Sequence, residues 1–145
     1  MTISHCTVRN FKSNGIRLQP AGNTTFLIAD TVASNNGGSI QVRPQGTGSA
    51  QGTFDHVSAN KNGDGIGVSG HAAALAVYST AANNTESGFG VGGSGAVLRL
   101  AHSAATGNAT GVFVASGDLA ESAGDNFIRG NGTDVSGTLI NVGTR

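Results

Sequence analysis

The chain has 145 residues, of which 24 are glycine, two are proline and none is tryptophan, so it is long enough for one domain and rich in turn-forming residues. Eight lysines and arginines balance eight aspartates and glutamates, which excludes the long-range field that attracts nucleic acids or anionic membrane surfaces. One cysteine excludes an internal disulfide and a thiolate metal site, and no stretch reaches the ~18 consecutive apolar residues of a membrane span.

Five short segments, taken in chain order, repeat one pattern of a small residue, an apolar residue and a second apolar residue two positions later. They are Gly15–Leu18, Ser39–Val42, Gly65–Val68, Gly88–Val91 and Gly111–Val114. Their first apolar residues, followed by a weaker match at Val135, are 24, 26, 23, 23 and 23 residues apart. Self-similarity at a period of about 20–50 residues indicates a solenoid, in which each coil buries its apolar side by stacking on its neighbours.

Two further sets of apolar residues precede these segments in each coil. The first set lies eight or nine residues upstream, at Val8, Val32, Val57, Ala81, Ala104 and Phe127. The second set consists of alternating runs that include Ile3, Phe26, Ile28, Phe54, Leu75, Val77, Leu98 and Leu100. Alternation with a period of two is typical of a strand with one buried face. Each coil is therefore predicted to hold three short strands, with these apolar residues facing the interior.

The turn before the third strand of each coil is rich in asparagine. These residues are Asn14, Asn35, Asn36, Asn60, Asn62, Asn83, Asn84, Asn108 and Asn131. Asparagine tolerates left-handed corners, and stacked amides can hydrogen-bond to one another along the axis. Glycine occupies the position just before the third strand in four coils, which indicates an unusual backbone angle or a close approach. Asp134 occupies this position in the last coil, so we expect that coil to be distorted.

The predicted fold is all-β: a parallel β-helix of about six coils that would be about 29 Å long, because strands stack ~4.8 Å apart. The run from Thr31 to Val42, with Thr-Val, Ser-Asn-Asn-Gly-Gly and Ile-Gln-Val, resembles the right-handed parallel β-helix repeat proteins. Its bacterial extracellular members are similar in fold to pectate lyases, polygalacturonases and phage tailspikes. The resemblance covers nearly the whole chain and implies a right-handed coil and an extracellular or cell-surface location.

The domain organisation follows from where the repeats lie. We expect residues 1–145 to form a single β-helix domain. Repeat material begins at the second residue and the chain shows no signal-peptide pattern, so we also expect it to be a fragment of a longer protein.

The resemblance makes acidic residues the candidates for a catalytic role, because polygalacturonase and pectate-lyase chemistry both need clustered carboxylates. The chain lacks the Asp-Asp and Gly-His-Gly motifs of polygalacturonases. The remaining candidates are Asp30 and Asp55, predicted to share a column in adjacent coils, with His56 beside the second. The other histidines are too scattered in this register to join them: His5, His71 and His102. A lyase or glycoside hydrolase acting on uronate-containing glycans is therefore the alternative function, with Ca²⁺ as its cofactor; otherwise no cofactor or metal site is predicted.

A binding surface is predicted on the outward face of the third strands. Four long donor side chains point to solvent there: Arg17, Gln19, Gln41 and Arg43. In later coils Gly67 and Gly90 hold the same column and leave a shallow floor. Arginine pairs with uronate carboxylates and glutamine with hydroxyls, so the leading interpretation is a non-catalytic scaffold or weak polysaccharide-binding module. Polysaccharide is the expected partner, without nucleic acid or membrane, and unpaired edges of the terminal coils favour end-to-end self-association.

Overall fold

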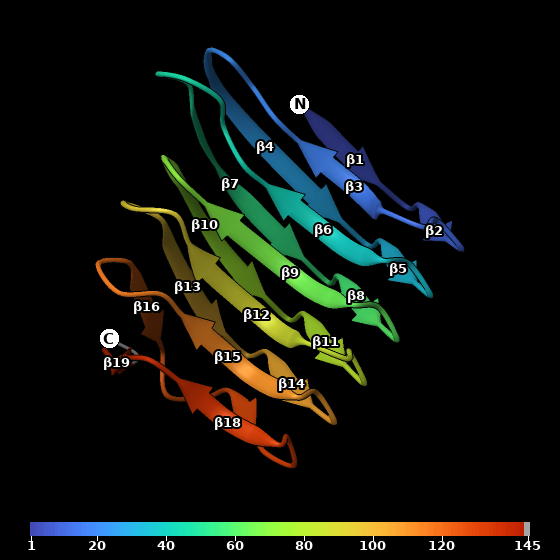
Figure 1. Ribbon diagram of the computed structural model, residues 1–145, viewed down its shortest axis with the longest axis vertical. Coiled ribbons are helices and arrows are strands. Elements are labelled where there is room, and N and C mark those ends of the chain that lie inside the picture. The colour runs from blue at the N-terminus through green and yellow to red at the C-terminus, as the bar shows by residue number, and fades with distance from the viewer. Residues whose placement is uncertain (144–145) are drawn as a thin grey trace.

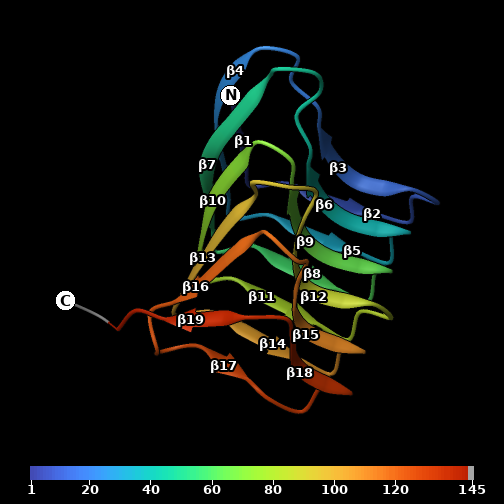
Figure 2. The same cartoon turned by 60° about the vertical axis from the view of Figure 1, so that its left-hand side comes forward.

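The computed structural model describes residues 1–143, and over this range every regular element is a β-strand (Figure 1). Each coil contributes one strand to each of three parallel sheets, which run along the length of the molecule (Figure 2). Within these residues no helix is long and apolar enough to cross a membrane. The predicted all-β solenoid of about six coils with three strands each is therefore confirmed.

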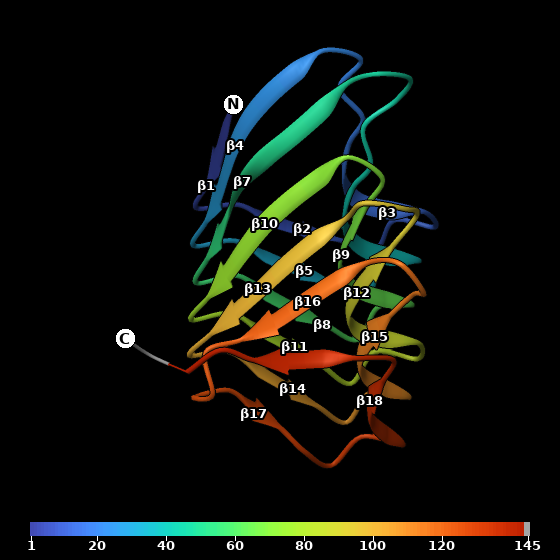
Figure 3. The ribbon, with the colours of Figure 1, turned by 90° about the vertical axis from the view of Figure 1, so that its left-hand side faces the viewer.

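The three sheets are called A, B and C in the order in which a coil passes through them. Sheet A, whose strands lie nearest the viewer in Figure 3, has the spatial order β1 (Thr2–Ser4), β4 (Asn23–Ala29), β7 (Ser49–Asp55), β10 (Ala72–Val77), β13 (Val97–Ala101), β16 (Leu119–Ser122) and β19 (Leu139–Asn141). Sheet B has the order β2 (Thr7–Arg9), β5 (Val32–Ser34), β8 (Ser58–Asn60), β11 (Thr80–Ala82), β14 (Ala104–Thr106) and β17 (Phe127–Ile128). Sheet C has the order β3 (Asn14–Leu18), β6 (Gly38–Val42), β9 (Asp64–Ser69), β12 (Ser87–Gly92), β15 (Thr110–Val114) and β18 (Thr133–Ser136).

Sheet C has the register that the repeat predicts. The first apolar residues of its strands pair in one continuous column: Ile16, Ile40, Ile66, Phe89, Val112 and Val135. The members from Ile40 to Val112 are fully buried. This column therefore forms one wall of the interior, and its prediction is confirmed.

Sheet B differs from the prediction by one residue in three of its strands and by two residues in β8. Its inward column is Val8, Ala33, Ala59, Ala81, Ala105 and Ile128. Val32 and Phe127 consequently face outward and are exposed, whereas Val57 is buried at the corner before β8. A slip of one residue turns a side chain to the opposite face, and strands of three residues carry too little alternation to prevent that error.

Strand β10 is also reversed relative to the prediction. Ala74 and Ala76 face the interior, whereas Leu75 and Val77 lie on the outer face and are only half-buried. The inward Ala76 lies beside Phe54 of the preceding coil, so small and large side chains share the interior volume. Because both faces of this strand are apolar, alternation of polarity could not assign them.

An asparagine ladder runs along the interior below the turns that precede sheet C. Its members are Asn36, Asn62, Asn84, Asn108 and Asn131. Asn62 shows the repeating unit, because its backbone N–H and its Nδ2 both donate to Oδ1 of Asn84, at 2.9 and 3.2 Å. The same Nδ2 also donates to the carbonyl of Ala33 at 3.0 Å. The predicted stacking of amides is confirmed, and it satisfies polar groups that would otherwise be buried without partners.

The glycines before the third strands are needed for close approach. A Cβ atom on Gly65 would overlap the carbonyl oxygen of Gly88 and lie 3.0 Å from Nδ2 of Asn84. Neither Gly65 nor Gly88 has a positive φ, so an unusual backbone angle is not the reason for glycine there. The ladder and the neighbouring coil together leave no room for a side chain at this position.

Asp134 caps the asparagine ladder at its C-terminal end. Oδ1 of Asp134 accepts hydrogen bonds from the backbone N–H and from Nδ2 of Asn131, at 3.2 and 3.1 Å. These are the two bonds that the next asparagine of the ladder would accept. The expected distortion is not seen, since Val135 of β18 still pairs with Val112 of β15. The carboxylate of Asp134 thus takes the place of the next asparagine side chain in the ladder.

Replacing Asp134 by asparagine tests this cap, because asparagine keeps the carbonyl acceptor and removes the titration. The hydrogen bonds from Asn131 hold the pKa of the Asp134 carboxyl below its ordinary value of 3.8, and the charge of Arg129 acts in the same direction. A depressed folded-state pKa adds stability that is present above the unfolded pKa and is lost as the pH falls through the folded value. We therefore expect wild type to lose stability relative to Asp134→Asn as the pH falls below 3.8. Urea denaturation at stepped pH measures this, and a pH-independent difference would contradict it.

Candidate functional site

A groove of about 410 Å³ crosses the outer face of sheet C, over strands β6, β9, β12 and β15. Its floor is low because the outward positions at the centre of β9 and β12 are glycines, Gly67 and Gly90. Its polar and aromatic lining comes from Gln41, Asp64, Glu86, Ser87, Thr110 and Phe113. The shallow floor predicted from the sequence is therefore present.

The polar groups of the groove are ordered by contacts between neighbouring coils. Ser87 Oγ donates a 2.7 Å hydrogen bond to Oδ1 of Asp64, which fixes this carboxylate against the sheet. The amide of Gln41 lies against Gly67, where any Cβ atom would meet its Oε1. The ring of Phe113 is exposed at the C-terminal end of the groove. The groove thus offers carboxylate and amide groups in its middle and an apolar ring at one end.

The four donors predicted for binding divide between two places. Gln41 lines the groove and pairs in register with Arg17 of β3. Arg17 and Gln19 line a separate hollow of about 350 Å³ at the first coil, and Arg43 is exposed just after β6. Only Gln41 of the four therefore contributes to the groove itself.

The acidic residues of the groove were not among the predicted binding residues. Asp64 and Glu86 lie at the start of the third strands, where alternation breaks because two successive residues, such as Gly65 and Ile66, both face inward. The hydrogen-bonded column that contains Asp64 and Ser87 could have been found only by aligning the coils on their buried residues.

A second cluster of polar side chains follows the corner between sheets A and B. Its members, here called the corner file, come one from each coil: His5, Asp30, His56, Tyr78, His102 and Asp125. The column is confirmed by backbone bonds such as the one from Asp30 N–H to the carbonyl of Asp55, at 3.0 Å. The histidines that seemed scattered are therefore aligned, and only His71 lies elsewhere.

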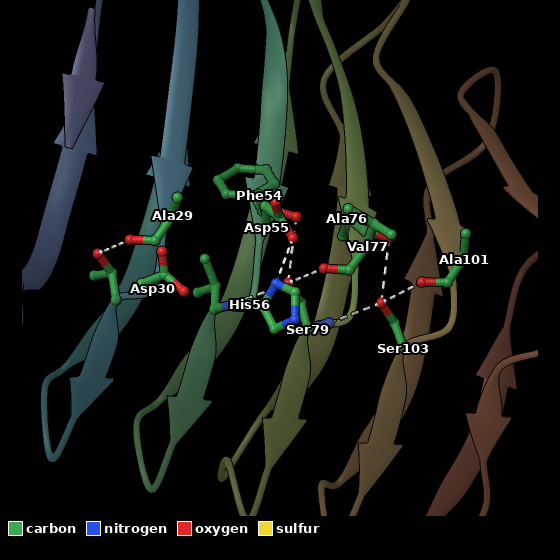
Figure 4. Close-up of polar contacts among 12 residues, drawn as sticks. Ala29, Asp30, Phe54, Asp55, His56, Ala76, Val77, Ser79, Ala101 and Ser103 are labelled. Carbon is green, nitrogen blue, oxygen red and sulfur yellow. Dashed lines mark hydrogen bonds and ion pairs between the residues drawn. The ribbon is translucent and has the colours of Figure 1, made fainter. Parts of the chain in front are cut away.

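The predicted catalytic group falls on this corner with a different register. Asp30 and Asp55 do not share a column, because Asp55 pairs with Ala29 and it is His56 that follows Asp30 in the file (Figure 4). Oδ1 of Asp55 lies 2.6 Å from Nδ1 of His56, so the carboxylate orients the imidazole. The prediction of two stacked carboxylates is thus wrong by one residue, whereas the proximity of Asp55 and His56 is real. Among residues 1–143 no group of three or more His, Cys, Asp or Glu side chains is placed to hold a metal ion.

Ring stacking and ion pairs connect the corner file from coil to coil. The ring of Tyr78 stacks on His56 and on His102, with centroids 5.0 and 4.9 Å apart. His5 Nε2 lies 3.7 Å from a carboxylate oxygen of Asp30, and His102 Nδ1 lies 3.1 Å from one of Asp125. Every member of the file therefore contacts a side chain in its own or a neighbouring coil, and its outward edges remain in solvent.

A buried hydroxyl ladder holds the backbone beneath the file. Ser79 Oγ accepts a hydrogen bond from the N–H of Val57 at 3.1 Å, and Ser103 Oγ accepts one from the N–H of Ser79 at 3.1 Å (Figure 4). Each hydroxyl also donates to the carbonyl two residues earlier, at 2.9 Å. The spacing of the corner side chains is consequently set by a rigid support.

Most residues of the corner file adopt a left-handed backbone conformation, which Asp and His tolerate better than a bulky residue such as Tyr78. Five of its six residues have positive φ, from 46° at His102 to 55° at His5. At the following corner the equivalent positive-φ positions hold Asn10, Asn35, Lys61, Asn83, Gly107 and Gly130. A left-handed conformation costs about 1 kcal/mol in a residue with a Cβ atom, and such positions concentrate at functional sites. A ring such as Tyr78 at this corner is therefore a candidate for a role beyond the turn itself.

Comparison with known proteins gives one match. The family model described as a right handed beta helix region matches residues 1–142. No curated protein and no solved structure matches the chain. The match agrees with the three parallel sheets and covers both the groove and the corner file.

Proposed function

The chain belongs to the right-handed β-helix family, and on that premise we propose that it is a non-catalytic module that binds an extended polysaccharide along the groove of sheet C. The observation that carries the proposal is the groove itself, about 410 Å³ in volume, with a glycine floor and an ordered polar lining. Binding sites are commonly concave surfaces with a few placed polar groups. A secreted or cell-surface location is part of the proposal and rests on the family resemblance.

The chemistry of the lining favours a ligand rich in hydroxyl groups. The Asp64 carboxylate, the Gln41 amide and the Thr110 hydroxyl can accept or donate hydrogen bonds, and the ring of Phe113 offers an apolar face to the C–H side of a sugar. Asp64 and Glu86 would repel a uronate within the groove. The middle of the groove therefore suits a neutral sugar, and an acidic sugar would be accommodated only beyond Gln41, towards Arg17 and Arg43.

Closing the floor of the groove tests this proposal. A Cβ atom on Gly90 would lie 3.3 Å from Ser87 Oγ and otherwise project into open space, so Gly90→Val should fold and obstruct the groove. Calorimetric titration with neutral and uronate oligosaccharides is expected to show binding in wild type and at least about tenfold weaker binding in Gly90→Val and Phe113→Ala, since one lost contact of about 1.4 kcal/mol is tenfold in affinity. Thr53→Val on the outer face of sheet A is the matched control and should bind normally.

Two results of the same titrations would contradict the proposal. Unchanged binding in Gly90→Val would place the ligand elsewhere, and loss of binding in Thr53→Val would remove the groove as the explanation. Release of unsaturated oligosaccharides in the presence of Ca²⁺ would instead support the lyase alternative. Its loss in Asp55→Ala would then assign that activity to the corner where Asp55 contacts His56.

A further inference from the structure

We propose that the corner file is a contact surface for a second copy of this chain, which lies alongside the first in the antiparallel direction. This contact follows from the order of the six side chains and is independent of glycan binding. Read from the first coil to the last, the order is His5, Asp30, His56, Tyr78, His102 and Asp125. When a second copy runs in the opposite direction, each residue of the file lies opposite a residue that can pair with it.

A two-fold axis between His56 and Tyr78 pairs every member with a suitable partner. His5 meets Asp125 of the second copy, Asp30 meets its His102, and His56 meets its Tyr78. A closed two-fold contact requires this self-complementarity, in which residue i meets j and j meets i. Parallel alignment would instead place Asp30 on Asp30 and Asp125 on Asp125, and like charges repel. The antiparallel arrangement keeps these carboxylates apart and brings each of them to a histidine ring, which can donate a hydrogen bond to it.

The contacts within one copy leave atoms free for these pairings. His102 uses Nδ1 for Asp125 and His56 uses Nδ1 for Asp55, so Nε2 of each ring remains for the second copy. His5 uses Nε2 for Asp30, which leaves its Nδ1. The file is half-exposed and held from below by Ser79 and Ser103, so little ordering is needed when the contact forms.

The outward column of sheet B beside the file follows the same two-fold order. The exposed Val32 of β5 would meet Ala104 of β14, and Ser58 of β8 would meet Thr80 of β11. In these two pairs an apolar residue faces an apolar one and a hydroxyl faces a hydroxyl, whereas the outermost pair of the column would set Thr7 against the exposed Phe127. The two copies have the same spacing between coils, so the side chains of successive coils stay opposite their partners along the whole contact. The strip is one corner wide, and narrow interfaces of this kind are weak and concentration-dependent.

Cysteine cross-linking distinguishes this arrangement from other modes of association. In a Cys6→Ser background, chains carrying Val32→Cys are mixed with chains carrying Ala104→Cys and oxidised. The proposal predicts a disulfide-linked heterodimer, and neither variant alone should form a disulfide-linked dimer, because Val32 and its own copy would lie about three coils, or ~14 Å, apart. Thr53→Cys, on the outer face of sheet A, is the control and should not cross-link to either variant.

Sedimentation equilibrium tests the role of the charges. We expect wild type to dimerise with increasing concentration and Asp30→Asn to weaken the dimer at least fivefold, since asparagine tolerates the positive φ of Asp30 but carries no charge. Glu86→Gln, which removes a carboxylate on the sheet C side, should dimerise as wild type does. The proposal is overturned if wild type remains monomeric at millimolar concentration, if Val32→Cys cross-links to itself, or if Asp30→Asn and wild type associate equally.

Discussion

Asn84→Ala is expected to lower the free energy of unfolding by about 3–5 kcal/mol, because it removes one rung from the middle of the buried asparagine ladder. Asn84 is almost completely buried and its Oδ1 accepts from both the backbone N–H and Nδ2 of Asn62. Its own Nδ2 donates to Oδ1 of Asn108 and to the carbonyl of Ala59. Alanine would leave the backbone N–H of Asn62 without its acceptor and would remove one hydrogen bond each from Nδ2 of Asn62, Oδ1 of Asn108 and the Ala59 carbonyl. A buried polar group left without a partner costs about 1–3 kcal/mol.

Asn23→Ala is the matched control for this change. Asn23 is exposed on β4 and accepts one hydrogen bond, from Ser49 Oγ at 2.9 Å, so water can replace it. Urea denaturation followed by circular dichroism should give a loss of less than about 0.5 kcal/mol for the control. Equal losses for Asn84→Ala and Asn23→Ala would show that the ladder does not stabilise the coil stack.

Gly65→Ala is expected to destabilise the protein by about 3 kcal/mol or more, or to prevent folding, because no side chain fits between two coils at this position. The added Cβ atom would overlap the carbonyl oxygen of Gly88 in the next coil and press on Nδ2 of Asn84. The obstructing atom belongs to the backbone, so relief requires the two coils to separate. That separation would weaken the hydrogen bonds between β9 and β12 as well as the ladder.

Gly22→Ala separates this steric effect from the general effect of replacing glycine. A Cβ atom on Gly22 would meet no atom within 4 Å, and the φ of Gly22 is not positive. We expect thermal unfolding of Gly22→Ala to match or slightly exceed that of wild type, since alanine restricts the unfolded chain. If Gly65→Ala melted at the same temperature as Gly22→Ala, close packing at the glycine position would be disproved.

The sequence predicted the structure correctly where a distinctive residue recurs at the same position of successive coils. Ile40, Ile66 and Phe89 share a column because each follows the same small residue after an Asn-rich turn. The outward glycines Gly67 and Gly90 followed from that register and gave the floor of the groove correctly. The aligned asparagines likewise followed from their spacing.

Prediction failed where strands are short or apolar on both faces. Val32 and Leu75 were assigned to the interior, but the adjacent Ala33 and Ala74 face it instead. The same uncertainty of one residue placed Asp30 beside Asp55 when it lies beside His56. The histidines of the corner file went unrecognised for this reason, since a shift of one position in any coil breaks a column.

The sequence by itself determined the solenoid, its period and the strand that carries the groove. Equivalent positions in stacked coils have similar surroundings and therefore require the same kind of residue. Only the tertiary structure decided which side chains share a column at the corners and which atoms meet across coils. Spacing along the chain varies from 23 to 26 residues, whereas the contact between Ser87 and Asp64, or between Tyr78 and His102, depends on hydrogen-bond register between coils. That register is set by the packing of the whole stack, which no single coil encodes.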